Sequence, residues 1–188
     1  MHSSLPTSTI TQAAEVVRQG GVIAYPTEAV FGLGCDPDNE KAIQDILDLK
    51  QRSADKGLII IASEIKQLEA YVDTIPDTLW QKVMSTWPGP VTWLMPARPS
   101  ISKLLTGQHN TIAVRVTGHP VARAICEQLT KPIVSTSANK TNRLPALSVE
   151  DIYDQFDGQV SCVVGGEVDT RSKPSEIRDL LSDKIIRG

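Results

Sequence analysis

The run Leu58–Ala62 constrains the fold of this chain more than any other segment. Its sequence, LIIIA, is short, apolar and rich in β-branched residues, which is typical of a strand covered on both faces. Similar patterns predict strands at 22–25, 91–95, 111–116 and 132–135. Strands of this kind need helices packed on the sheet, so helical segments should lie between them.

Amphipathic segments do alternate with these strands. Thr9–Gln12 has the spacing of a capping box and predicts the start of a helix that ends at Gly20 and Gly21. A second capping arrangement, Ser148–Asp151, predicts another short helix. Further segments with helical periodicity are 39–50, 63–71, 77–86 and 120–130. This order of elements predicts α/β layers.

The last third of the chain changes the expected sheet from parallel to mixed. Strands are predicted at 160–164, 176–179 and 184–187, and their short connections suit antiparallel pairing. Earlier in the chain, segment 26–34 contains a proline and two glycines and predicts an ordered turn. We therefore expect an α/β fold with a mixed sheet flanked by helices.

Composition narrows the class of protein. A chain of 188 residues with 40% hydrophobic and 22% charged residues fits one domain with a continuous core. Its three cysteines are far apart and odd in number, which argues against a disulfide framework and favours a reducing cytoplasm. No signal-peptide pattern or long apolar stretch is present, so we expect neither export nor membrane insertion. The net charge of −3 leaves room only for a local anion site.

Lys50, Arg52 and Lys56 form the first candidate anion site. They lie between a predicted helix end and an apolar strand. Arginine can bind two phosphate oxygens at once and lysine adds a mobile charge, so this pattern suits a polyphosphate. Alternatively, the three cations form a solvated helix terminus that complements the helix dipole.

The sequence STSAN at 135–139 is the second candidate. Small hydroxyl and amide groups follow an apolar strand here, at the position where open α/β sheets bind ligands. Ser135, Ser137 and Asn139 could bind phosphate or carboxylate oxygens, or could only satisfy their own backbone. Ser137 and Lys140 also match the SxxK pattern of serine acyltransferases, but the companion SDN and KTG elements are absent from the sequence.

Arg115 is unusual because it interrupts the apolar strand 111–116. A guanidinium there needs a carboxylate, which either a substrate or an internal Asp or Glu could supply. Thr27 and Glu28 follow a strand in a similar way, and could instead belong to a simple proline turn. Neither a GxGxxG nor a GxxxxGK[ST] pattern occurs, which argues against a standard Rossmann or P-loop nucleotide site. The histidines lack metal-ligand spacing, so we expect no protein-held metal.

Taken together, six blocks resemble the YrdC/TsaC family in its short bacterial single-domain form. They are, in order, PTEAVFGLGCDP, LKQRSADKGLIII, WPGPVTWLMPA, TIAVRV, STSAN and PSEIRD. The resemblance covers about residues 8–188 and leaves 1–7 as an N-terminal tail. It implies a twisted open mixed sheet with a concave, positively charged face.

The resemblance also implies a reaction. L-Threonine, bicarbonate and ATP would give threonylcarbamoyl-AMP and pyrophosphate, with Mg2+ held mainly through the ATP phosphates. A separate tRNA threonylcarbamoyl transferase complex would then modify the adenosine beside the anticodon in tRNAs that read ANN codons. A second hypothesis is a binding module whose concave basic face holds double-stranded RNA during ribosome maturation, without catalysis.

By motif, the resemblance assigns roles to individual residues. Those that would surround the ATP phosphates are Lys50, Arg52, Ser137 and Asn139, assisted by Lys56 and with Arg187 near the nucleotide. Arg115 would bind the threonine carboxylate, in a pocket shaped by Thr27, Thr111, Ser135 and Ser175. The sequence departs from the wider family at Ala29, where longer members have threonine, at Ile61, where they have histidine, and in the loop 140–145, which lacks the usual glycine.

Overall fold

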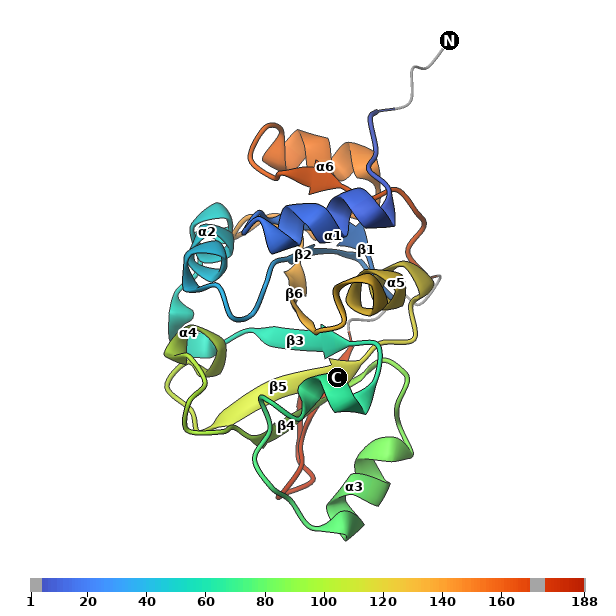
Figure 1. Cartoon of the computed structure of the whole chain (residues 1–188). Helices are drawn as coiled ribbons and strands as arrows, with labels where there is room; N and C mark the ends of the chain where they lie inside the picture. Colours follow the sequence, from blue (N-terminus) through green and yellow to red (C-terminus); the bar gives the residue numbers. More distant parts are fainter. Residues whose placement is uncertain (1–4, 170–174, 188) are drawn as a thin grey trace.

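One mixed sheet organises the computed structural model, which describes residues 5–169 and 175–187 (Figure 1). Its strands run in the order β7-β1-β2-β6-β3-β5-β4-β8-β9. They are β1 (Ile23–Pro26), β2 (Phe31–Gly34), β3 (Ile59–Ala62), β4 (Val91–Pro96), β5 (Thr111–Val116), β6 (Ile133–Ser137), β7 (Cys162–Val163), β8 (Glu176–Asp179) and β9 (Ile185–Arg187). The β1–β7, β3–β5 and β4–β8 pairs are parallel and the others antiparallel, so the predicted mixed sheet is confirmed. The antiparallel pairing expected for the late strands is confirmed for β8 with β9 and wrong for β7 and β8 with their other neighbours, β1 and β4, because those strands lie far away in sequence and run in the same direction.

The described part of the chain has six α-helices, of which five match predicted helical segments, whereas the short helix at Lys103–Thr106 was not predicted. The helices are α1 (Ile10–Arg18), α2 (Glu40–Lys50), α3 (Asp77–Met84), α4 (Lys103–Thr106), α5 (Pro120–Leu129) and α6 (Val149–Phe156), with short 3-10 turns η1 (Ala54–Lys56) and η2 (Ile65–Leu68). Both predicted capping boxes are present, at Thr9 with Gln12 and at Ser148 with Asp151. No helix in the described part of the chain is long and apolar enough to cross a membrane.

The prediction of a helix over residues 63–71 is wrong, because only the short turn η2 forms there. In this segment the amides of Gln67 and Glu69 bond to carbonyls three residues earlier, those of Glu64 and Lys66, both at 3.3 Å. Side chains bind backbone groups at the two ends: the Gln67 side chain accepts the Ser63 amide at 3.0 Å, and Arg98 Nε donates to the carbonyls of Glu69 and Val72 at 2.9 and 3.1 Å. Periodicity predicts a helical stripe but does not distinguish a short 3-10 turn held at its ends from a full α-helix.

Segment 26–34 contains more regular structure than the predicted turn. Its second half is β2, which pairs with β1 from Pro26↔Phe31 to Ile23↔Gly34. The glycines that suggested a turn mark close packing instead, since a Cβ at Gly34 would lie 2.7 Å from the Val134 carbonyl oxygen.

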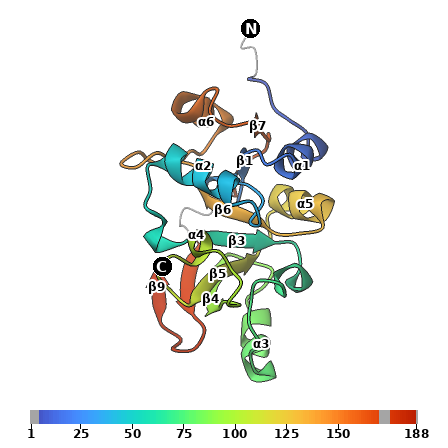
Figure 2. The same cartoon turned by 60° about the vertical axis from the view of Figure 1, so that its left-hand side comes forward.

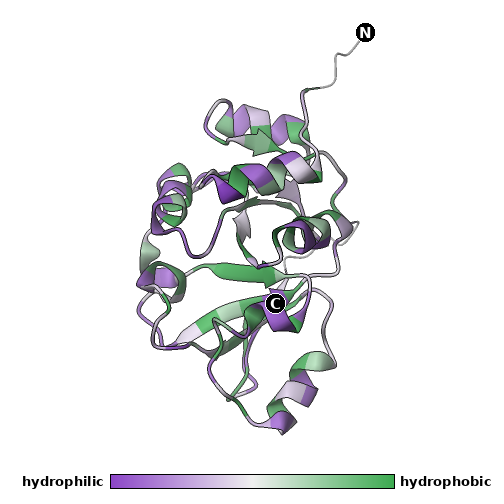
Figure 3. Cartoon of the chain, in the orientation of Figure 1, coloured by the Kyte–Doolittle hydropathy of each residue, from purple (hydrophilic) through white to green (hydrophobic). Residues whose placement is uncertain are grey.

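The sheet separates two hydrophobic clusters. The larger cluster packs α2, α6 and η2 against one face and takes Ile112, Val114 and Val116 from β5. The smaller cluster lies on the other face, where α1 and α5 lie side by side over β1 (Figure 2). The helices are accordingly striped in hydropathy, whereas β3 is apolar along its length (Figure 3). Because α1 and α5 cover only part of their face, the rest of that face lies open.

Removing a core side chain from α2 tests this packing. Ile46 is fully buried in the larger cluster, so Ile46→Ala should lower the free energy of unfolding by about 2–5 kcal/mol. Lys41→Ala on the same helix should cost only about 0.5 kcal/mol or less, because the Lys41–Asp45 pair is exposed. Urea unfolding followed by circular dichroism measures both. Equal effects would contradict the assigned core face of α2.

Candidate active site

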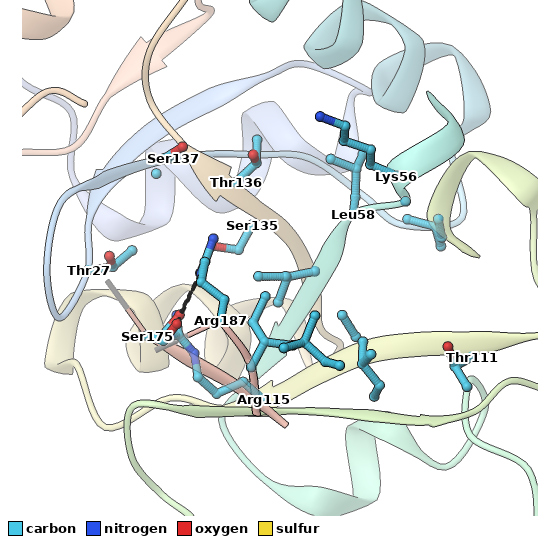
Figure 4. A pocket seen from close by; sticks show the side chains of 18 of the residues that line it. Thr27, Lys56, Leu58, Thr111, Arg115, Ser135, Thr136, Ser137, Ser175 and Arg187 are labelled. Carbon is cyan, nitrogen blue, oxygen red and sulfur yellow. Dashed lines mark hydrogen bonds between the residues drawn. The ribbon is translucent and has the colours of Figure 1, made fainter. Parts of the chain in front are cut away.

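The open part of the sheet face forms a cavity of about 960 Å³. Pockets for small ligands commonly span roughly 300–1,000 Å³, so this one lies near the upper end of that range. Ten of the residues singled out from the sequence line it, namely Thr27, Arg52, Lys56, Thr111, Arg115, Ser135, Ser137, Asn139, Ser175 and Arg187. Most of these side chains are labelled in Figure 4, where they surround one hollow.

Strand alternation places several of these groups. On β5, Thr111, Ala113 and Arg115 line the cavity, while the residues between them enter the larger core. On β6, Ser135 and Ser137 line the cavity from the antiparallel neighbour of β3. The two hydroxyl groups and the guanidinium therefore share one face of the sheet.

Arg52 enters the cavity from the turn after α2. Its Nη2 donates to the Gly57 carbonyl at 3.0 Å, while its buried Nε has no partner among the described residues. Burial lowers the pKa of this guanidinium. Gly57 has φ +62° and a Cβ there would lie 2.5 Å from the Leu105 carbonyl oxygen, so only glycine fits. Together with the exposed Lys56, Arg52 forms a cationic wall.

Lys50 is not part of this cationic wall, because it is not among the described residues that line the cavity. Its Nζ donates to the carbonyl oxygens of Ser137 and Asn139 and to the Asn139 Oδ1, the last two at 2.9 and 3.2 Å. Burial and the neighbouring Arg52 lower its pKa to about 8. The predicted contact of Lys50 with ATP stays a prediction. In the structure Lys50 bonds to residues 137–139 (Ser-Ala-Asn), which we call the SxN segment.

The polar groups of the SxN segment are also bonded among themselves. Ser137 Oγ donates to Asn139 Oδ1 at 2.7 Å, and Asn139 Nδ2 donates to the carbonyls of Lys140 and Arg143, each at 3.1 Å. Both alternatives raised for this segment are thus present, since Ser137 and Asn139 satisfy local groups and still line the cavity. Lys140 Nζ lies 5.7 Å from the Phe156 ring centroid, and no hydrogen bond in the described part joins it to Ser137, so the SxxK hypothesis gains no support.

The loop 140–145 is ordered despite its missing glycine. The Gln155 side chain accepts the Lys140 amide at 3.2 Å and donates to the Leu144 carbonyl at 3.0 Å. Pro145 of this loop lines the cavity. The other two departures differ in position, because Ala29 lines the cavity whereas Ile61 is fully buried in the smaller cluster.

Arg115 has an internal partner, Glu28. Their Nη2 and Oε2 atoms are 3.3 Å apart, and the two residues are only 5% and 4% exposed. Glu28 Oε1 accepts the Thr117 hydroxyl at 2.7 Å and the Gly118 amide at 3.1 Å. Burial by itself raises the pKa of Glu28, but Arg115 and these donors outweigh it and lower the pKa. The internal carboxylate considered for Arg115 exists, and the guanidinium still borders the cavity.

Arg187 closes the cavity from β9. Its Nη2 donates to the Ser175 carbonyl at 3.1 Å and lies 3.4 Å from the Ser175 hydroxyl (Figure 4). Partial desolvation lowers its pKa, and repulsion from Arg115 and Arg52 adds to that effect. Three guanidinium groups therefore converge, and a bound anion would relieve their mutual repulsion.

The acidic residues at the cavity are already engaged. Glu28 is paired with Arg115, and Asp179 Oδ1 accepts the amide and the hydroxyl of Ser182, both at 2.7 Å. In the described part of the chain, no group of three His, Cys, Asp or Glu side chains is arranged to hold a metal ion. An ion bound here would therefore need ligands from the substrate.

Several residues that line the cavity were not predicted from the sequence. They include the apolar residues Leu58, Ile59, Leu94 and Ile177 and the loop 106–110 other than Gly107. Glu28 was recognised only as a residue after a strand, although an arginine in the apolar strand 111–116 already pointed to an acidic partner. The loop 106–110 carries no periodic signal that would have placed it at the cavity.

Comparisons with known proteins give a consistent result. The family model Sua5_yciO_yrdC, described as telomere recombination, matches residues 15–188. A threonylcarbamoyl-AMP synthase of Vibrio vulnificus strain YJ016 is 47% identical over 182 residues, which cover 96% of this chain and 98% of the relative. A threonylcarbamoyl-AMP synthase of Klebsiella pneumoniae is 46% identical, over 100% of this chain and 99% of the relative.

Solved structures agree with the described fold. P. abyssi Sua5 complexed with L-threonine has a TM-score of 0.88 at 31% identity, over 95% of this chain. The match covers 53% of the Sua5 chain, so this chain spans about half the length of that protein. E. coli YciO has a TM-score of 0.80 at 28% identity, over 97% of this chain and 91% of YciO.

The lowered pKa of Glu28 predicts a contribution to acid stability. A carboxyl group whose pKa is lower in the folded state stabilises the fold above its ordinary pKa, and the contribution is lost as the pH falls through the folded value. Wild-type protein should therefore lose more stability between about pH 5 and pH 3 than Glu28→Gln, as measured by urea midpoints. Glu127→Gln, at an exposed pair, should behave like wild type. Parallel losses in wild type and Glu28→Gln would contradict the assignment.

Proposed function

Because the chain belongs to the Sua5/YciO/YrdC family, we propose that it converts L-threonine, bicarbonate and ATP into threonylcarbamoyl-AMP and pyrophosphate. Relatives that bear the name of this synthase match nearly the whole chain. The observation that carries the proposal is the convergence of polar groups from β5, β6, β9 and the α2–β3 connection on one cavity. Such a cavity suits two substrates held side by side.

The amino acid would bind at the end of the cavity that contains Arg115. A guanidinium presents paired donors that match a carboxylate, and the buried Nε of Arg115 has no partner among the described residues. Thr27 precedes Glu28, the partner of Arg115, and Ser135 and Ser175 border the same hollow, so these three residues would contact the threonine side chain or ammonium. Thr111 lines the cavity on the same strand as Arg115, four residues away.

The triphosphate would bind along Arg52 and Lys56. Both line the cavity and neither has an acidic partner in the described ion pairs. Ser137 and Asn139 would add hydroxyl and amide contacts, with Lys50 holding them from behind. Arg187 would lie near the nucleotide, where its charge meets a negative ligand.

The chemistry needs positioning more than it needs a nucleophilic side chain. Bicarbonate takes up a proton and loses water to give CO2, and the threonine amine then forms a bond to the CO2 carbon and releases a proton, which gives a carbamate. A carbamate oxygen then attacks the α-phosphorus, and the bond between that phosphorus and the leaving pyrophosphate breaks. Fixed cations that meet the developing charge lower the barrier to this step.

Partners follow from the same proposal. We propose that Mg2+ enters with ATP and is held mainly by phosphate oxygens and water, since the carboxylates at the cavity are engaged. The product would pass to a tRNA threonylcarbamoyl transferase complex in the cytoplasm, where tRNA is modified. Double-stranded RNA binding is the alternative for the cationic wall, and salt would weaken it steeply.

Pyrophosphate release tests the activity. With ATP, Mg2+ and bicarbonate, threonine should give at least about tenfold faster release than serine or valine, since each lacks one group that the pocket would contact. Moderate salt should change this amino-acid preference little. Release that ignores threonine would refute the synthase, and RNA affinity that alone depends steeply on salt would favour the binding module.

Two lysine substitutions separate the two ends of the cavity. Arg115→Lys keeps a charge beside Glu28 but loses the forked geometry, so the KM for threonine should rise roughly 10- to 100-fold while that for ATP stays within about twofold. Arg52→Lys should do the reverse. Steady-state pyrophosphate release with one substrate varied at a time measures both. If both variants raised both KM values equally, the two assignments would be wrong.

A further inference from the structure

Glu28 is held by groups that do not line the cavity. Thr117 is fully buried, and its hydroxyl donates to Glu28 Oε1 at 2.7 Å while accepting the His119 amide at 3.2 Å. The Gly118 amide donates to the same carboxylate oxygen at 3.1 Å. The other oxygen, Oε2, faces Arg115 and has no hydrogen bond among the described residues.

This arrangement connects distant parts of the sheet. Glu28 lies in the turn between β1 and β2, whereas Arg115 lies on β5, and the sheet order places β2, β6 and β3 between β1 and β5. The ion pair therefore reaches across the face that carries the cavity. In Figure 4, Thr27, the neighbour of Glu28, and Arg115 border the same hollow from opposite sheet segments.

The hydrogen bonds to Glu28 also fix which of its carboxylate oxygens faces Arg115. A carboxylate free to rotate could place both oxygens on the guanidinium and compete with a substrate carboxylate. Thr117 and Gly118 instead occupy Oε1, so only Oε2 is left for Arg115. The Nε donor of Arg115 has no partner among the described residues and stays available to a ligand, while the two hydrogen bonds to Oε1 hold the carboxylate in one orientation.

We propose that Thr117 and Glu28 are positioning residues that orient Arg115 for the amino-acid carboxylate. The inference rests on the proposed synthase activity and adds two residues to it. Thr117 is not among the described residues that line the cavity, so its hydroxyl would reach the amino-acid site through Glu28, and its other hydrogen bond is to the His119 amide. The sequence RVTG at 115–118 thus supplies both the clamp and the group that fixes its counter-ion.

Thr117→Val tests the proposal because it removes the hydroxyl and keeps the shape. The KM for threonine should rise roughly tenfold, with the KM for ATP within about twofold of wild type. Thr92→Val is the matched control, because Thr92 is equally buried, is not among the described residues that line the cavity and has a hydroxyl without a partner among the described residues. It should leave both KM values within about twofold. Thr117→Ser keeps the hydroxyl and should restore the threonine KM.

Glu28→Gln supplies a second, independent measurement if Thr117→Val does not fold. Its amide oxygen can still accept from Thr117 and Gly118, but its charge is gone, so the threonine KM should rise again roughly tenfold. In the double variant the two effects should not add, because both act through one carboxylate.

The outcomes distinguish this inference from the proposed function. Wild-type release that does not depend on threonine would refute the function itself. If wild type needs threonine but Thr117→Val matches Thr92→Val, the positioning role is refuted. A Thr117→Val variant that raises both KM values alike, or a Glu28→Gln variant that binds threonine more tightly, would also refute it.

Discussion

The alternation of side chains along β5 and β6 is the constraint on which the site depends. On β5 it sends Ile112 and Val114 into the larger core and leaves Arg115 on the opposite face. A shift of one residue in the register would bury the guanidinium among apolar side chains and expose the core residues. The same register therefore stabilises the fold and builds the cavity, and the two cannot vary independently.

The fold was largely predictable because its core strands and helices carry strong periodic signals. Leu58–Ala62 contains β3, the 111–116 prediction matches β5, and both capping boxes form. The failures occurred where tertiary contacts outweigh local pattern. Gln67 and Arg98 bind backbone groups at the two ends of the η2 segment, and Gly34 of β2 lies too close to the Val134 carbonyl oxygen for a Cβ.

The site was predictable in its residues but less so in their relations. Motif blocks identified groups that do line one cavity, yet Lys50 lies behind the SxN segment and bonds to its carbonyl oxygens. A sequence shows that a lysine is near a helix end, but not which way its flexible side chain turns. The Arg115–Glu28 pair likewise joins segments 87 residues apart, and only the folded sheet brings them together.

The division of charge within the cavity follows from that pairing. Arg115 is balanced by Glu28, so this pair carries little net charge of its own and would suit the carboxylate of a zwitterion such as a free amino acid. Arg52 and Lys56 lack acidic partners in the described ion pairs, so their end suits a highly charged anion. A triphosphate would gain little at the balanced end, and a neutral zwitterion would gain little at the cationic one. Arg187 is repelled by both Arg115 and Arg52, so its charge is available to an anion at either end, and the shape of the cavity must complete the choice of orientation.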